Sequence, residues 1–159
     1  MKLYLLFLLM ATTTVLSPGP GVVMTLSNAL RFGFRPALGG IMGIATGASV
    51  VAAVSATSAG ALLASSALAF TVLKLVGAAY LIYLGIKLWR APPFVFNTSS
   101  APAGSFGRRF AEGLSLQFTN PKAIFFFLSV FPQFIDPAQP YASQFMALVL
   151  TYSALVVLI

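Results

Sequence analysis

Residues 37–73 contain no charged side chain, and the apolar character continues to Tyr83 with Lys74 as the only interruption. At about 1.5 Å per helical residue, this run is too long for one crossing of a hydrocarbon core roughly 30 Å thick. It must therefore fold as a hairpin of two membrane spans. Only 7% of the residues are charged, whereas roughly a quarter are charged in soluble domains. The sequence therefore predicts an all-α integral membrane protein whose surroundings are the lipid bilayer.

Five apolar segments are present, and together they predict a polytopic helix bundle with five spans. The segments comprise residues 3–30, 37–61, 67–87, 110–134 and 142–159. Residues 88–109, between the third and the fourth segment, are rich in Pro, Ser, Ala and Gly, which is typical of a loop. We expect the whole chain, residues 1–159, to form a single transmembrane domain.

Basic side chains predict the orientation of these spans. The connections after the first and third segments hold Arg31, Arg35, Lys87, Arg90, Arg108 and Arg109. The connections after the second and fourth segments hold no Lys or Arg. Because cytoplasmic loops carry an excess of these residues, we expect the first and third loops in the cytoplasm and the N-terminus outside. The basic residues would then anchor the protein at the membrane surface, so nucleic acid is not an expected partner.

Proline interrupts two of the apolar segments. The run Ser17-Pro18-Gly19-Pro20 lies in the middle of the first segment, and Asn120-Pro121 lies in the middle of the fourth. Proline cannot continue a helix, whereas Asn is a favoured N-cap and Pro a favoured first helical residue. Each site can therefore end one half-helix and begin another. The spacing of the two breaks predicts an inverted repeat of three plus three spans, in which matched breaks indicate the binding site of a transporter.

The second halves of both broken segments would point their N-termini at the membrane midplane from opposite sides. Each such end exposes unpaired N–H groups, here those of residues 21–23 and 122–124, and about half a positive charge. Lys122 adds a full charge at the same depth, so the ends predict an anion site suited to a carboxylate. The predicted binding residues are Ser17, Pro18, Gly19, Pro20, Gly21, Asn120, Pro121 and Lys122. The alternative is that the prolines only kink the helices.

Lys74 lies several residues inside the third segment, where a charge is expensive unless it reaches the interface or a polar interior. Helical spacing places it on the face that also carries Gly77, Ala78, Leu81 and Gly85, which suits a neighbouring helix. We therefore expect Lys74 to point inward as a further substrate-binding residue, with snorkelling to the interface as the alternative. Gly39, Gly43 and Gly47 in the second segment predict close helix packing.

The chain contains no Cys or His, and its two acidic residues are Glu112 and Asp136. Disulfides, thiolate-bound metals and imidazole ligands are therefore excluded, and no metal or cofactor is expected. The sequence shows no nucleophile paired with a base, so an enzyme is not expected. Proton coupling through a carboxylate must use Glu112 or Asp136, although both lie near predicted span ends, where a solvated role is the alternative.

Four stretches of the sequence resemble the LysE/RhtB family of amino-acid exporters, or translocators, over almost the whole chain. They are "SPGPGVV", "GGIMGIATG", "KLVGAAYLIYLGIKLWR" and "RRFAEGLSLQFTNPKAIFFFLSVFPQF". The family's motif residues correspond to Ser17, Pro18, Gly19, Pro20, Gly77, Tyr80, Gly85, Lys87, Gly113, Asn120, Pro121 and Lys122. The resemblance implies a six-helix bundle in the cytoplasmic (inner) membrane of a bacterium that exports amino acids or their derivatives, in exchange for protons.

Two functional hypotheses follow. As an exporter, the protein would bind a small zwitterionic amino acid with its carboxylate at the paired half-helix ends and its ammonium on carbonyls freed by the same breaks. The alternative is a non-transporting membrane subunit in which the glycines and prolines serve packing or assembly. Because the family's sixth helix is expected to be missing here, the chain could be a fragment, a degenerate copy or a protein completed as a homo-oligomer.

Overall fold

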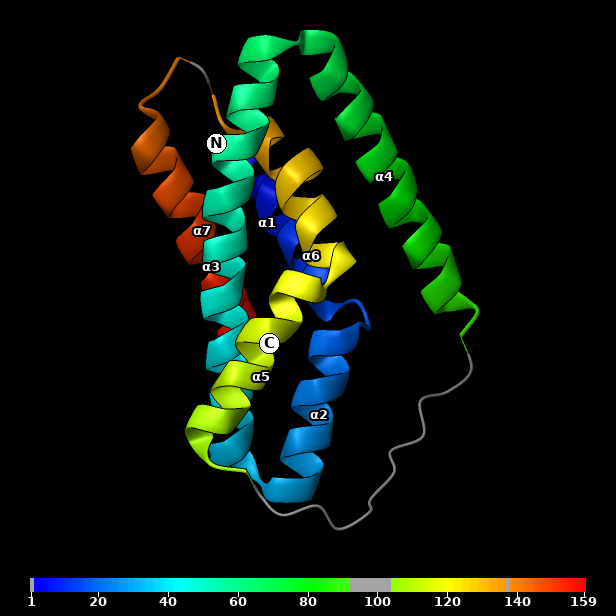
Figure 1. The fold of residues 1–159 in the computed structure, drawn as a ribbon, viewed down its shortest axis with the longest axis vertical. Coiled ribbons are helices and arrows are strands. Elements are labelled where there is room, and N and C mark those ends of the chain that lie inside the picture. Colours follow the sequence, from blue (N-terminus) through cyan, green and yellow to red (C-terminus); the bar gives the residue numbers. More distant parts are fainter. Residues whose placement is uncertain (1, 92–103, 137) are drawn as a thin grey trace.

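A computed structural model describes residues 2–91, 104–136 and 138–159, and these residues are helical apart from short connections (Figure 1). The elements are α1 (Lys2–Leu16), α2 (Pro20–Phe32), α3 (Phe34–Ser65), α4 (Ala67–Trp89), α5 (Phe106–Thr119), α6 (Pro121–Phe125), η1 (Phe126–Val130), η2 (Phe131–Phe134) and α7 (Tyr141–Leu158). The described residues contain no strand. The predicted all-α class is therefore confirmed.

The first predicted break separates α1 from α2. Helix α1 ends at Leu16, α2 begins at Pro20, and the two axes differ by 55°. Gly19 is the N-cap residue of α2 in an extended conformation, and Pro20 occupies the first helical position. Proline is favoured there because its fixed φ suits a helix and its missing N–H would have no intrahelical acceptor. The break predicted from Ser17-Pro18-Gly19-Pro20 is confirmed.

The second predicted break separates α5 from α6. Asn120 is the N-cap residue of α6, and its side-chain oxygen accepts a hydrogen bond from the N–H of Lys122 at 3.1 Å. After Phe125 the helix widens into the π-helical turn η1 and then tightens into the 3₁₀ turn η2. The roles predicted for Asn120 as N-cap and Pro121 as first helical residue are confirmed.

The two broken helices run in opposite directions. In Figure 1, α1 and α2 descend while α5 and α6 rise, and the two breaks lie at about the same level midway along the long axis. The long helix α3 runs beside both, and Gly39, Gly43 and Gly47 on it face α5. A Cβ built on Gly47 would lie 2.7 Å from the Cβ of Gln117, and one on Gly39 would lie 2.7 Å from the carbonyl oxygen of Phe106. The predicted close packing is confirmed.

Aromatic side chains form the core at the end of the bundle shared by α1, η1, η2 and α7. Phe7, Phe126, Phe127 and Phe131 are at most 1% exposed. The rings of Phe7 and Phe134 pack edge to face at 5.3 Å between centroids. Such aromatic pairs add about 0.5–1.5 kcal/mol beyond the burial of their area. Phe7 therefore ties the first half of the broken helix pair α1–α2 to the second half of the pair α5–α6.

Three helices are long and apolar enough to cross a membrane, namely Phe34–Leu62, Ala67–Trp89 and Tyr141–Leu158, and the bent pair α1–α2 makes up to four. The described chain is thus compatible with a polytopic helical membrane protein. Residues 110–134 do not qualify as one helix, because the chain breaks at Asn120 and leaves the shorter apolar helix Pro121–Phe134. The fifth span stays a prediction.

The helices differ by a few residues from the predicted segments. Helix α3 begins at Phe34 and ends at Ser65, beyond the predicted bounds 37–61, and α5 begins at Phe106, inside the predicted loop 88–109. Residues 92–103 of that loop lie outside the described residues. The α2–α3 junction and the start of α5 lie at the lower end of Figure 1, whereas α4 ends about midway along the long axis.

Candidate functional site

The two breaks meet through the side chain of Lys122. Its ammonium donates hydrogen bonds to the carbonyl oxygens of Thr14 at 2.8 Å and Ser17 at 2.9 Å. These carbonyls are available because α1 stops at Leu16, which leaves its last C=O groups without intrahelical donors. The negative end of the helix dipole lies at the same place and favours a cation. One residue of the second break thus caps the helix that ends at the first break.

Glycine at position 19 makes this approach possible. A Cβ built on Gly19 would lie 3.1 Å from the Lys122 nitrogen and 3.4 Å from its Cε. A larger residue would require the end of the Lys122 side chain to shift by a few tenths of an ångström. The motif of the first break therefore favours a small residue at position 19 because of this contact, since the extended backbone of Gly19 (φ −164°, ψ 177°) is open to any residue.

A cavity of about 210 Å³ lies at the junction of the two breaks, and we call it the central cavity. Its polar lining comes from Thr14, Gly21, Thr25, Gln117, Asn120, Lys122 and Tyr152. A second cavity of about 280 Å³ lies between α1, α4 and η1, and Ser17 and Lys122 line it. Lys122 therefore lies between two cavities, and the structure brings the predicted residues Ser17, Gly21, Asn120 and Lys122 together.

The predicted backbone donors need a correction. The N–H of Val23 bonds to Gly19, the N–H of Ile124 bonds to Asn120, and the N–H of Lys122 bonds to the Asn120 side chain. These groups are occupied by the first turn of each helix. The N–H groups of Gly21, Val22 and Ala123 belong to the positions that have no intrahelical acceptor. Three N–H groups from two helices are thus left at the predicted anion site, which stays a prediction.

Gln117 and Tyr152 also line the central cavity but were not among the predicted site residues. Gln117 is 3% exposed, and the base of its side chain packs beside Gly47 of α3. One signal in the sequence could have indicated Gln117: it lies three residues before Asn120, one helical turn away on the same face.

The chain matches the family model described as LysE type translocator over residues 12–159. This chain belongs to the LysE type translocator family. It is 40% identical over 145 residues to a homoserine/homoserine lactone efflux protein of Salmonella typhimurium (strain LT2), a match that covers 91% of this chain and 70% of that protein. No solved structure matches the chain.

Two further relatives of this translocator are membrane proteins. The chain is 40% identical over 148 residues to an uncharacterized membrane protein of Vibrio cholerae, covering 93% of this chain and 72% of that protein. It is 30% identical over 141 residues to the uncharacterized membrane protein YrhP of Bacillus subtilis, a match that covers 83% of this chain and 67% of that protein. The resemblance noted in the sequence is therefore confirmed, and the protein is a membrane translocator rather than an enzyme.

The prolines of the translocator shape the site without forming much of its wall. Pro18, Pro20 and Pro121 are exposed. Neither Pro18 nor Pro121 lines the central cavity or the second cavity, and Pro20 faces a different groove between α2 and α5. The prolines contribute by ending and starting helices, while glycine, Asn120 and Lys122 supply the contacts.

Lys74 lies apart from the central cavity. It is half-buried on α4, about two turns before Leu81, which lines the second cavity. Only part of its predicted packing face is packed: Gly77 lies against the Ser129 side chain, whereas Ala78 is exposed and Gly85 has open space beside it. The predicted role of Lys74 in substrate binding stays a prediction.

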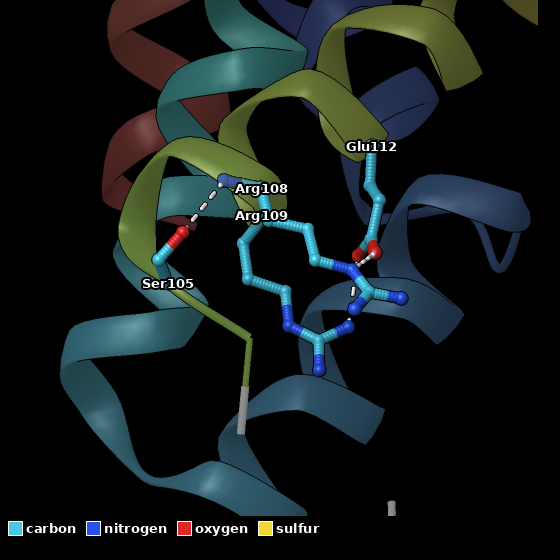
Figure 2. Close-up of polar contacts among 4 residues, drawn as sticks. All are labelled: Ser105, Arg108, Arg109 and Glu112. Carbon is cyan, nitrogen blue, oxygen red and sulfur yellow. Dashed lines mark hydrogen bonds and ion pairs between the residues drawn. The ribbon is translucent and has the colours of Figure 1, made fainter. Parts of the chain in front are cut away.

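Neither carboxylate lines the central cavity. Glu112 pairs with Arg108 at 3.2 Å and with Arg109 at 2.8 Å near the start of α5 (Figure 2). Asp136 lies before α7, where its side chain accepts a hydrogen bond from the N–H of Ala138 at 2.9 Å. Proton coupling through either group stays a prediction. Within the described ranges there is no group of three His, Cys, Asp or Glu that could hold a metal ion.

Proposed function

We propose that this translocator exports amino acids or their derivatives across the membrane and that the substrate binds in the central cavity. The observation that carries the proposal is the meeting of both helix breaks at this cavity through Lys122, which bonds to Thr14 and Ser17 across the first break. A structural kink would need neither a cavity nor a charge at this depth, because an intramembrane lysine is expensive.

The substrate carboxylate would bind at the N-termini of α2 and α6. The N–H groups of Gly21, Val22 and Ala123 have no intrahelical acceptors, and the positive ends of both helix dipoles favour an anion. The Asn120 cap holds the start of α6 in place. Lys122 would turn from the carbonyls of α1 to the carboxylate, where a charge-assisted hydrogen bond in a water-poor site is strong.

The substrate ammonium would take the place that Lys122 leaves. The Thr14 and Ser17 carbonyls already accept two hydrogen bonds from one ammonium. An amino acid carries the same group beside its carboxylate, so it can fill this position while Lys122 binds its other end. The exchange keeps every buried charge paired, and this avoids the large cost of a lone charge in the bundle.

The name of the Salmonella relative suggests homoserine and homoserine lactone as first substrates to test. Gln117 and Thr25 line the same cavity and can hydrogen-bond a hydroxyl group on a short side chain. The lactone has no free carboxylate, so it lacks the group that the anion site would bind. Homoserine should therefore depend on Lys122 more than the lactone does.

The proposal includes an architecture. Residues 1–159 would form one transmembrane domain in the bacterial cytoplasmic (inner) membrane, with residues 110–134 as a fifth, broken span. The antiparallel course of the two broken helices and their matched breaks favour an inverted repeat. The end that carries Arg31, Arg35 and Arg108 would face the cytoplasm. Export would be in exchange for protons, with Glu112 and Asp136 as candidate proton carriers and association into a homo-oligomer as one option.

Transport by membrane vesicles tests the proposal. We expect vesicles with the wild-type protein to move radiolabelled homoserine and to stop when the proton gradient is collapsed. Lys122→Gln should lower homoserine transport about tenfold, because it removes a charge-assisted hydrogen bond. Transport of homoserine lactone by the same variant should fall less.

Arg90→Gln is the matched control, because it removes an exposed positive charge at the end of α4. It should transport like the wild type. Lys74→Gln in the same assay decides the separate prediction for Lys74. Equal transport of homoserine by wild type and Lys122→Gln, at matched protein levels in the membrane, would contradict the binding mode.

A further inference from the structure

A third cavity, of about 460 Å³, lies between α2 and α5 on the basic half of the bundle, and we call it the α2–α5 groove. Its lining on α2 extends from Pro20 at the first break to Arg31 in the last helical turn. Eleven residues of helix correspond to about 16 Å, which is roughly half the thickness of the hydrocarbon core. The groove therefore connects the basic end of the bundle with the level of the breaks.

The α2–α5 groove carries a net positive charge. Arg31, Arg108 and Arg109 line it together with a single acidic residue, Glu112, so two positive charges remain. In Figure 2, Arg108 and Arg109 both turn toward Glu112, which holds their guanidinium groups close together. The guanidinium carbon of Arg109 also lies 4.3 Å from the centre of the Phe32 ring. Arg109 is thus held between Glu112 and Phe32, whereas the Arg108 side chain is 71% exposed.

Two buried donors in the wall of this groove have no acceptor. The side-chain nitrogen of Asn28 and the Nε of Arg109 lack a hydrogen-bond partner among the described residues. Asn28 is only 4% exposed, and the Arg109 side chain is 12% exposed. An unpaired buried donor is unfavourable, and such groups are rare in folded proteins. Both donors are on residues that line the groove.

We infer that the α2–α5 groove is a second binding site, which takes the carboxylate of the exported molecule at the basic end before it reaches the central cavity. This inference rests on the proposed function and on the predicted orientation. A carboxylate offers only acceptors and a negative charge, which match the two donors without partners and the two excess positive charges. Arginine binds such a group with several donors in a fixed geometry. Glu112 acts as a positioning residue that aligns the arginines.

The test compares the two faces of the membrane. Inverted vesicles present the cytoplasmic face and right-side-out vesicles present the outer face to radiolabelled homoserine. Asn28→Leu removes one donor, and Arg109→Lys removes Nε while keeping the charge that pairs with Glu112. Each change should raise the KM for homoserine at the cytoplasmic face about tenfold, as expected for one lost hydrogen bond to a charged group. The maximal rate and the KM at the outer face should not change.

The lactone and a surface variant serve as controls. Homoserine lactone has no carboxylate, so its KM should not change in either variant. Arg35→Gln removes an exposed charge at the same end but outside the groove, and it should behave like the wild type. Because the removed Asn28 donor has no partner, Asn28→Leu should unfold at a temperature no lower than the wild type. If Arg109→Lys folds poorly, Asn28→Leu alone decides the question.

Three outcomes would overturn the inference. An unchanged cytoplasmic KM for homoserine in Asn28→Leu, together with reduced transport in Lys122→Gln, would remove the groove site and leave the central site. An equal rise in KM for the lactone would show that the carboxylate is not what is recognised. If the rise in KM disappears in liposomes without anionic lipid, the arginines bind lipid headgroups and not the substrate. Absence of any transport by the wild type would instead refute the proposed function itself.

Discussion

Adding one methyl group at Gly43 should separate α3 from α5, the helix that ends at the second break. Gly43 is buried on α3, and a Cβ built there would meet the carbonyl oxygen of Phe110 and lie 2.9 Å from the N–H nitrogen of Leu114. Cβ atoms essentially never lie closer than 3.0 Å to another heavy atom. The obstacle is α5 backbone, which cannot rotate away, so α3 and α5 must move apart.

The expected cost follows from two opposing effects. Overpacking a close contact costs about 1–3 kcal/mol, and an immovable backbone places this site at the upper end. Alanine recovers about 1 kcal/mol through its higher helix propensity. Gly43→Ala should therefore lower the free energy of unfolding by about 2 kcal/mol. Gly60 on the same helix has no atom within 4 Å of its Cβ position. Gly60→Ala should therefore raise the free energy of unfolding by up to about 1 kcal/mol.

Reversible unfolding in mixed detergent micelles, followed by circular dichroism, measures both free energies. The two substitutions are chemically identical and lie on one helix, so their opposite signs test the packing rather than the residue type. A Gly43→Ala protein that is as stable as Gly60→Ala would refute the close approach of α3 to α5. It would also remove the support that this contact gives to the position of Gln117 in the central cavity.

Three further predictions concern the breaks and the orientation. Asn120→Ala removes the N-cap of α6 and should lower the free energy of unfolding by about 1 kcal/mol in the same assay, whereas Asn120→Asp should keep most of it. Replacing Pro18 and Pro20 together by Ala should join α1 to α2 and increase the helical circular dichroism signal. It should also abolish homoserine transport, because the N–H groups at the start of α2 become paired within one continuous helix. Unchanged transport would show that the break is only a bend. Single cysteines at Gly107 and Gln139 should react with an impermeant thiol reagent from the cytoplasmic and outer faces respectively, and reaction from one face only would contradict the fifth span.

Local chemistry explains why the breaks could be predicted. Proline removes a donor and excludes the preceding turn wherever it stands in a helix, and Asn before Pro is a favourable helix start in any context. The observed N-caps at Gly19 and Asn120 therefore follow from adjacent residues alone. The glycine spacing on α3 was equally informative, because only a close helix partner makes a stripe of residues without side chains favourable.

Some parts of the site could not be predicted, because they depend on which helices become neighbours. The sequence indicated that Lys122 carries a charge near the second break, but only the packing of α6 against α1 decided that its ammonium bonds to Thr14 and Ser17. The same holds for Lys74. Its charge inside an apolar segment predicted a site residue, but the tertiary structure places it on α4, away from the central cavity. Side chains from segments far apart in the sequence can be assigned partners only when the tertiary arrangement is known.

The amino-acid sequence by itself determined the membrane environment, the helical class and the places where helices begin and end, because hydropathy, proline and capping act within a few residues. Tertiary structure alone decided that Asn28 and Arg109 line a groove with donors that lack acceptors. It also decided that Gln117 lines the central cavity. Whether a polar group has a partner depends on atoms contributed by other helices, and the positions of those helices follow from packing over the whole bundle.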